Sequence, residues 1–152
     1  MKKFLISVFM FLTVKSYSQQ TFMDKFNIFL TEWVHVPYKY GGTTKKGIDC
    51  SAFTQKIFNQ VFDLVIPRTA SRQFKFTERI EKELLEFGDL VFFRSKLSPS
   101  GWHVGFYIGE SKFVHAANKK EDIKVSSLQE EKYQNTFLGG GRVPQMIPQK
   151  QF

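Results

Sequence analysis

The spacing of apolar residues changes part-way along this chain, and that change constrains the fold more than any other feature. Up to residue 62 the apolar positions recur every three or four residues, as in Phe22, Phe26 and Phe29, which is the period of an amphipathic helix. From residue 90 onward they form short runs or alternate, as strands do, over Leu90–Phe93 and His103–Ile108. Helices followed by strands favour an α+β fold, with N-terminal helices packed on a C-terminal antiparallel β-sheet.

The chain is long enough for one ordinary core. It has 152 residues, of which 42% are hydrophobic and 18 are Phe. A chain of this size rarely divides into two independent cores, so we expect a single compact domain that packs Phe against aliphatic side chains. We also expect it to be a monomer.

The first eighteen residues have the pattern of a cleaved signal peptide. Lys2 and Lys3 precede an apolar run over residues 4–14, and the small residues Ser16 and Ser18 follow it. The run is too short to span a bilayer, which takes roughly 20 apolar residues, and residues 1–49 contain no Cys for a lipid anchor. We therefore expect export to the periplasm or the medium without a stable membrane anchor, and a mature domain over residues 19–152.

The net charge is +8 at neutral pH, which suits an anionic partner. For an exported protein that partner could be peptidoglycan, a membrane surface or nucleic acid, and charge alone does not choose among them. A cationic surface that only keeps the protein soluble fits the same number.

Cys50 is the one cysteine of the chain, so it has no intramolecular partner. It could be a small buried side chain, an intermolecular link or a reactive thiol. A second helical pattern begins near Asp49, and its apolar stripe includes Phe53, Ile57 and Phe58. Cys50 would lie in the first turn of that helix, where free N–H groups and the helix dipole favour a thiolate, so we expect a nucleophile.

Two histidines fall on neighbouring strands of the predicted sheet. A three-residue loop, Gly109 to Ser111, would join the strand of His103 to a strand over Lys112–Ala117 and would pair Ile108 with Lys112. His103 and His115 then become diagonal neighbours on one face. A two-residue loop would put them on opposite faces unless a bulge intervened.

Several ordered blocks resemble the NlpC-type peptidoglycan cysteine peptidases, over roughly residues 33–143. The blocks are Tyr38-Lys39-Tyr40-Gly41-Gly42, Gly47-Ile48-Asp49-Cys50-Ser51-Ala52-Phe53, Ile66-Pro67-Arg68-Thr69 with Gln73, Gly88-Asp89-Leu90-Val91-Phe92-Phe93, His103-Val104-Gly105-Phe106-Tyr107-Ile108-Gly109 and Phe113-Val114-His115-Ala116. Ordered blocks across most of a domain are far more specific than one short motif.

The resemblance implies a papain-like core in which a helix carries the nucleophile at its start. Carried over position by position, it makes Cys50 the nucleophile, His103 the general base, His115 the group that orients His103, and Tyr38 a residue near the oxyanion. Arg68 and Gln73 are expected to brace the site rather than to react.

The likeness is greatest to the murein D,D-endopeptidases of the family, and it places Asp49 and Ser51 along the substrate groove. It implies hydrolysis of peptide bonds in peptidoglycan, at the D-alanyl to diaminopimelyl cross-link, with no metal or organic cofactor and no nucleic-acid partner. Two alternatives stay open, which are a γ-D-glutamyl-diaminopimelate endopeptidase that uses the same residues and a peptidoglycan-binding protein without turnover. A zinc site made from Cys50, His103 and His115 is conceivable by ligand type, although the chain has no paired His motif.

Overall fold

The computed structural model describes residues 21–146, and the predicted signal peptide over residues 1–18 lies outside them. Residues 21–33 are helical. The other helices are α2 (Cys50–Phe62), α3 (Ala70–Phe76) and α4 (Glu131–Gln134), with 3-10 turns η1 (Lys82–Leu84) and η2 (Pro144–Met146). The strands are β1 (Thr43–Thr44), β2 (Gly47–Ile48), β3 (Glu78–Ile80), β4 (Leu90–Arg94), β5 (Trp102–Gly109), β6 (Lys112–Ala116), β7 (Ile123–Ser127) and β8 (Phe137–Arg142).

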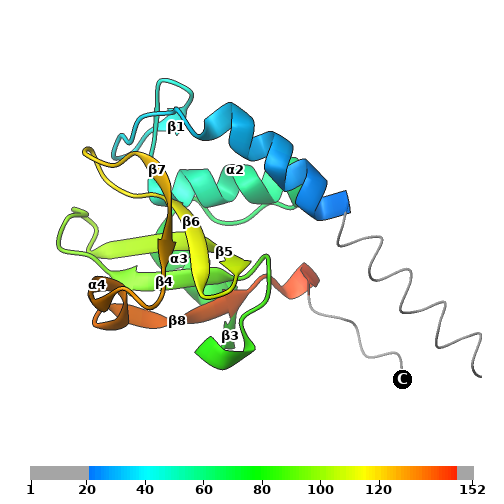
Figure 1. The fold of residues 1–152 in the computed structure, drawn as a ribbon, viewed down its shortest axis with the longest axis vertical. Helices are drawn as coiled ribbons and strands as arrows, with labels where there is room; N and C mark the ends of the chain where they lie inside the picture. The colour runs from blue at the N-terminus through cyan, green and yellow to red at the C-terminus, as the bar shows by residue number, and fades with distance from the viewer. Residues whose placement is uncertain (1–20, 147–152) are drawn as a thin grey trace, which may run out of the picture.

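Six of these strands form one antiparallel sheet in the order β3-β8-β4-β5-β6-β7, and β1 pairs with β2 in a separate ribbon. The helix over residues 21–33 and α2 lie together on one side of the sheet (Figure 1). The predicted α+β fold, with N-terminal helices on a C-terminal antiparallel sheet, is confirmed. No helix within residues 21–146 is both long and apolar enough to cross a membrane.

Helix α2 begins where the sequence predicts it. The side chain of its N-cap, Asp49, accepts a hydrogen bond from the N–H of Ala52, which satisfies one of the free donors at the helix start. The helix ends at Asp63, which has φ 56° and whose N–H bonds to the carbonyl of Phe58. The stripe that includes Phe53 and Ile57 is buried.

The two faces of the sheet bury different clusters. Val104 and Phe106 of β5 belong to the main core, where Phe106 stacks on Phe26 with ring centroids 5.0 Å apart. Tyr107 and Phe113 belong to the cluster on the opposite face, beneath α4. This division follows the alternation of β5, and it puts the helices against one face and His103 with Tyr107 on the other.

The β5–β6 hairpin differs from the predicted one at its turn. Gly109 pairs with Lys112, so the loop has two residues, Glu110 and Ser111, at φ 51° and 57°. Both lie in the left-handed region, as a type I′ turn requires. The predicted pairing of Ile108 with Lys112 is therefore wrong. A register shift between Tyr107 and Gly109 compensates, and Phe106 pairs with Val114 in the predicted register.

Candidate active site

Cys50 is the first residue of α2, and its thiol is buried against β5. On β5 the N–H of Tyr107 bonds to Asp89 on the β4 side, so by alternation the N–H of Val104 points toward β6. The paired residues of β5 and β6 begin only at Phe106, which leaves that N–H outside the ladder. It is directed at the Cys50 sulfur. The thiol thus sits where β5 and β6 separate, beside the strand that carries His103.

Burial governs the ionisation of this thiol. Loss of solvation raises the pKa of Cys50 to about 12, and the neighbouring Asp49 charge raises it further. Backbone N–H groups of Val104, Ser51 and Cys50 act in the opposite direction but do not outweigh burial. The thiolate expected from the helix dipole is therefore not the resting form, because the sheet covers the helix start.

His103 and His115 contact each other on one face of the sheet, as the predicted geometry requires. Nε2 of His103 lies 2.6 Å from Nδ1 of His115, and both rings are buried. If His103 keeps its proton on Nε2 and donates it to His115, its Nδ1 is free to accept a proton from a thiol.

Two hydroxyls complete this chain of polar groups, and sequence reasoning missed both. Nε2 of His115 lies 3.0 Å from Oγ of Ser126 on β7 and 3.3 Å from the hydroxyl of Tyr133 on α4. These hydroxyls are 3.4 Å apart. With its proton on Nε2, His115 donates to them and accepts from His103, so every ring nitrogen between His103 Nε2 and the hydroxyls has a partner.

Both histidines are neutral at physiological pH. Burial lowers the pKa of His103 to about 4, and the charge of Lys132 lowers it further. Burial also places the pKa of His115 well below 6.5, with contributions from His103 and from nearby lysines. The resting state of the site is therefore a neutral thiol beside a neutral imidazole pair.

Tyr38 lines the same pocket as Cys50 and is held in place by Asp122. Its backbone N–H donates to Oδ1 of Asp122 at 2.9 Å, which ties the loop before β1 to the loop after β6. Burial, with the nearby Cys50 and Asp49, raises the pKa of Tyr38 to about 12, so its hydroxyl keeps its proton and can donate a hydrogen bond.

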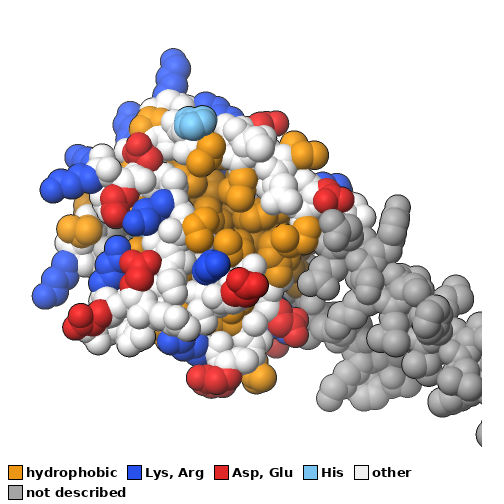
Figure 2. Space-filling model, viewed as in Figure 1, with side chains coloured by type: hydrophobic (Ala, Val, Ile, Leu, Met, Phe, Trp, Pro, Cys, Tyr) orange, Lys and Arg blue, Asp and Glu red, His pale blue; other side chains and the backbone are white. Residues whose placement is uncertain are grey.

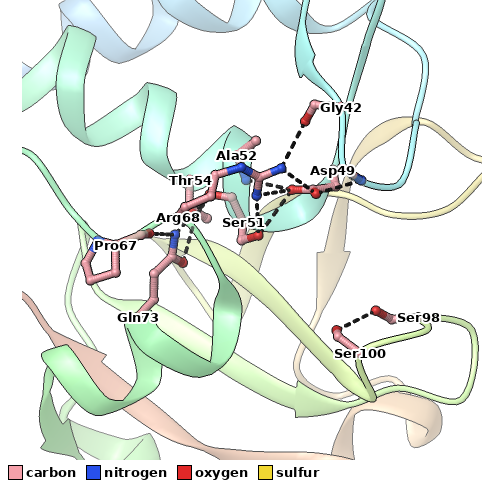
Figure 3. A network of polar contacts seen from close by, with 11 residues as sticks. Gly42, Asp49, Ser51, Ala52, Thr54, Pro67, Arg68, Gln73, Ser98 and Ser100 are labelled. Atoms are coloured by element: carbon pink, nitrogen blue, oxygen red, sulfur yellow. Dashed lines mark hydrogen bonds and ion pairs between the residues drawn. The ribbon is translucent and has the colours of Figure 1, made fainter.

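Asp49 and Ser51 form a tight network with Arg68 (Figure 3). The guanidinium of Arg68 donates to both carboxylate oxygens of Asp49, at 2.7 and 3.0 Å, and to the Ser51 hydroxyl at 3.0 Å. Gly41 also donates its N–H to Asp49, at 3.0 Å. Arg68 thus braces the cap of α2, as expected, and fixes the backbone on which Cys50 stands.

Gln73 supports the same helix end from α3. Its amide donates to the carbonyls of Ser51 and Pro67 at 2.9 and 2.8 Å, and its oxygen accepts from the Thr54 hydroxyl at 2.9 Å. Figure 3 shows this amide reaching from α3 toward the start of α2. Gln73 is fully buried, and these hydrogen bonds tie α3 to the start of α2.

Three neighbouring cavities surround these residues. The cysteine pocket, about 280 Å³, is lined by Cys50, Tyr38, Asp49, Ser51 and Arg68. The histidine pocket, about 350 Å³, is lined by residues that include His103, His115 and Lys132. A middle pocket of about 600 Å³ shares Tyr38 and Tyr40 with the first, and Leu97, Asn118 and Glu121 with the second. The shared residues make the middle pocket adjoin both the cysteine pocket and the histidine pocket.

The structure brings the predicted residues together in two groups, with Tyr38, Asp49 and Ser51 around Cys50 and with His103 in contact with His115. Among residues 21–146, no hydrogen bond joins the Cys50 sulfur to the His103 ring; the sulfur meets β5 at the next residue, Val104. Within the same residues, no group of three or more His, Cys, Asp or Glu side chains is placed to hold a metal ion.

Comparison with known proteins adds the family. The NlpC/P60 family model matches residues 35–142, which span α2, the sheet and every residue of the site described above. The chain belongs to the NlpC/P60 family. The resemblance seen in its sequence is thereby confirmed.

Curated members of this family resemble the chain over most of its length. A probable endopeptidase NlpC homolog from Haemophilus influenzae is 43% identical over 112 residues, which is 74% of this chain and 58% of the relative. The murein DD-endopeptidase MepS/murein LD-carboxypeptidase of Escherichia coli K12 is 40% identical over the same shares. The match thus spans little more than half the length of these relatives. A crystal structure of an NlpC/P60 family protein from Bacillus cereus superimposes with a TM-score of 0.69 at 28% identity, covering 79% of this chain and 39% of that one.

Proposed function

We propose that this protein is a cysteine endopeptidase that hydrolyses peptide bonds in peptidoglycan, at the D-alanyl to diaminopimelyl cross-link. The observation that carries the proposal is the burial of the Cys50 thiol against β5, the strand that carries His103 of the His103–His115 pair, in a member of the NlpC/P60 family. The murein DD-endopeptidase activity named for the Escherichia coli relative supports the choice of bond.

In the proposed reaction, His103 is the general base. Its Nδ1 takes the thiol proton as the Cys50 sulfur attacks the peptide carbonyl and forms a carbon–sulfur bond. Both groups are neutral at rest, so the charge on the His103 ring forms only as the thiol proton is transferred. By then the bound substrate has excluded water from the site. His115 orients His103 and spreads the charge that the ring gains.

The oxyanion that forms would accept hydrogen bonds at the start of α2. Backbone N–H groups at the helix start and the protonated hydroxyl of Tyr38 are the available donors. Collapse of the tetrahedral intermediate breaks the carbon–nitrogen bond, and His103 returns its proton to the departing amine. Water, deprotonated by His103, then hydrolyses the thioester and frees Cys50.

Asp49 and Ser51 line the acyl side of the groove in this proposal. Both residues line the cysteine pocket, where Arg68 holds the Asp49 carboxylate. The acting form is a monomer over residues 19–152, exported after cleavage of residues 1–18, and it uses no metal or organic cofactor.

The test is mass spectrometry of muropeptides released from purified sacculi, with Cys50→Ala as the inactive control. Loss of cross-linked dimers with gain of monomeric tetrapeptides, only with the wild-type protein, supports the proposal. Shortened stem peptides would move the bond to the γ-D-glutamyl linkage and keep the mechanism. Binding to sacculi without any product from either protein would leave a wall-binding protein, and loss of activity with a chelator would contradict the metal-free mechanism.

A further inference from the structure

His103 and His115 line the histidine pocket, whereas Cys50 lines the cysteine pocket. In the proposed reaction, His103 protonates the amine that leaves, so the leaving part of the substrate must lie on its side of the scissile bond. Cys50 lines the cysteine pocket, His103 lines the histidine pocket, and the middle pocket adjoins both. The histidine pocket is therefore the place for the leaving strand.

Three cationic side chains and one glutamate line that pocket. They are Arg94, Lys96, Lys132 and Glu121. Glu121 is already neutralised, since its carboxylate accepts from Lys124 at 2.9 Å and from the Asn118 amide at 2.8 Å. Lys96 forms no ion pair within residues 21–146, whereas Lys132 lies 3.5 Å from Glu130 and also interacts with Glu121 and the Tyr133 hydroxyl. With three cations and one carboxylate in its lining, the pocket has a net positive charge.

Lys132 is the cation nearest the chemistry. It follows Glu131 at the start of α4, and its ammonium lies over the ring of Tyr133, 4.7 Å from the centroid. Tyr133 in turn contacts His115. The charge of Lys132 acts on both histidines, so its ammonium stands close to them. Half of its side chain is exposed, which keeps it accessible to a ligand.

The wider surface agrees with this polarity. In Figure 1 the loops after β4 and β6 and helix α4 lie on the same side of the molecule as the start of α2. Lys and Arg side chains lie mainly on that side in Figure 2, interspersed with Asp and Glu, while apolar side chains gather toward the middle of the face.

We propose that the histidine pocket is a carboxylate-binding subsite for the leaving strand, with Lys132 as its anchor and Lys96 as a secondary contact. The ligand is an amino-acid residue whose carboxylate is free and close to the amine that the reaction releases. This rests on the proposed function, which defines the leaving side. A carboxylate-binding subsite gives a reason for cleavage next to residues that carry a free carboxylate. The same subsite selects against residues whose carboxylate is amidated.

The experiment measures binding to Cys50→Ala protein by isothermal titration. The probes are a disaccharide tetrapeptide monomer with free carboxylates and the same monomer after chemical amidation. We expect the free form to bind about tenfold more tightly, the scale of one charged hydrogen bond. Adding Lys132→Gln should remove that difference, Lys132→Arg should keep most of it, and Lys96→Gln should reduce it by a few-fold. Lys112→Gln, on the distant β5–β6 hairpin, is the matched control and should change nothing.

Equal binding of the two probes, or no effect of Lys132→Gln, would overturn the inference. Amide chemical shifts that move around the cysteine pocket and not at Lys132 and Thr136 would do the same. Digestion of sacculi separates this result from the proposed function. If wild-type protein cleaves sacculi but amidation has no effect on binding, the function stands and the subsite fails. If carboxylate-dependent binding occurs without cleavage, the subsite stands and the function fails.

Discussion

His103 and His115 are joined by a single short contact, 2.6 Å from Nε2 to Nδ1, across strands whose turn has two residues. A regular two-residue hairpin would have placed these rings on opposite faces of the sheet. The register shift between Tyr107 and Gly109 restores the shared face. The contact between His103 and the residue that orients it therefore depends on a bulge at the other end of β5.

This contact predicts how His115 can be replaced. The ring accepts a hydrogen bond from His103, so His115→Asn, which also offers an acceptor, should retain more activity than His115→Ala. We expect a loss on the order of 10⁴-fold in kcat/KM for Ala, as when the group that orients a catalytic histidine is lost, and a smaller loss for Asn. The measurement is the release of muropeptides from sacculi. Equal losses in both variants would show that the acceptor at this position does not matter.

The resting ionisation of the site predicts its pH profile. The pKa of His103 is about 4 instead of 6.5, so this base stays deprotonated and active well below neutrality. We expect kcat/KM to hold as pH falls toward 5 and to drop as pH passes through about 4. An inflection near 6.5 would contradict a buried neutral histidine.

The same shift predicts the acid stability of the fold. Between pH 6.5 and about 4 the unfolded chain binds a proton at His103 that the folded chain does not bind, so stability falls as pH falls through this window. The shift of the His103 pKa contributes about 3 kcal/mol to the free energy of unfolding. This contribution is present in full above pH 6.5 and is lost as the pH falls to about 4. Thermal unfolding of wild-type protein and His103→Gln across this window measures it, and the variant should lose the His103 part of the slope.

A further prediction concerns the reactivity of the thiol. Because burial raises the pKa of Cys50 to about 12, iodoacetamide should alkylate it more slowly at pH 7 than it alkylates a free cysteine. The rate, followed by mass spectrometry, should rise with pH above 8. Fast alkylation at pH 6 would instead show a thiolate paired with an imidazolium at rest.

The sequence predicts those parts of the site that depend on local pattern. Asp49 caps α2 and Cys50 opens it because capping and apolar period are properties of adjacent residues. The hairpin turn was missed because neither Glu110 nor Ser111 is the Gly or Asn that usually marks left-handed backbone.

Tertiary features were beyond the same reasoning. Ser126 and Tyr133 meet His115 only through the pairing of β6 with β7 and the packing of α4 beneath the sheet, for which no short pattern exists. The high pKa of Cys50 likewise depends on how completely β5 covers the helix start. Distances and burial of this kind are set by the assembled fold, and not by any one segment.

The two hydroxyls behind His115 offer the last prediction. Each is an acceptor for the Nε2–H of His115, at 3.0 Å from Ser126 and 3.3 Å from Tyr133, so either can serve when the other is removed. Ser126→Ala and Tyr133→Phe should each lower kcat/KM by only a few-fold. The double variant leaves a buried N–H without a partner and should cost about 1–3 kcal/mol of stability, together with a loss of activity larger than the product of the single effects.

Tyr107→Phe is the matched control, because the Tyr107 hydroxyl bonds to the N–H of Ser111 in the turn and not to a histidine. The substitution removes a phenolic hydroxyl from the same face of the sheet and should leave kcat/KM unchanged. Double-mutant cycles in thermal unfolding and in muropeptide release give the coupling between Ser126 and Tyr133. Additive losses would mean that the hydroxyls act independently, and His115 would then be held by the His103 contact alone.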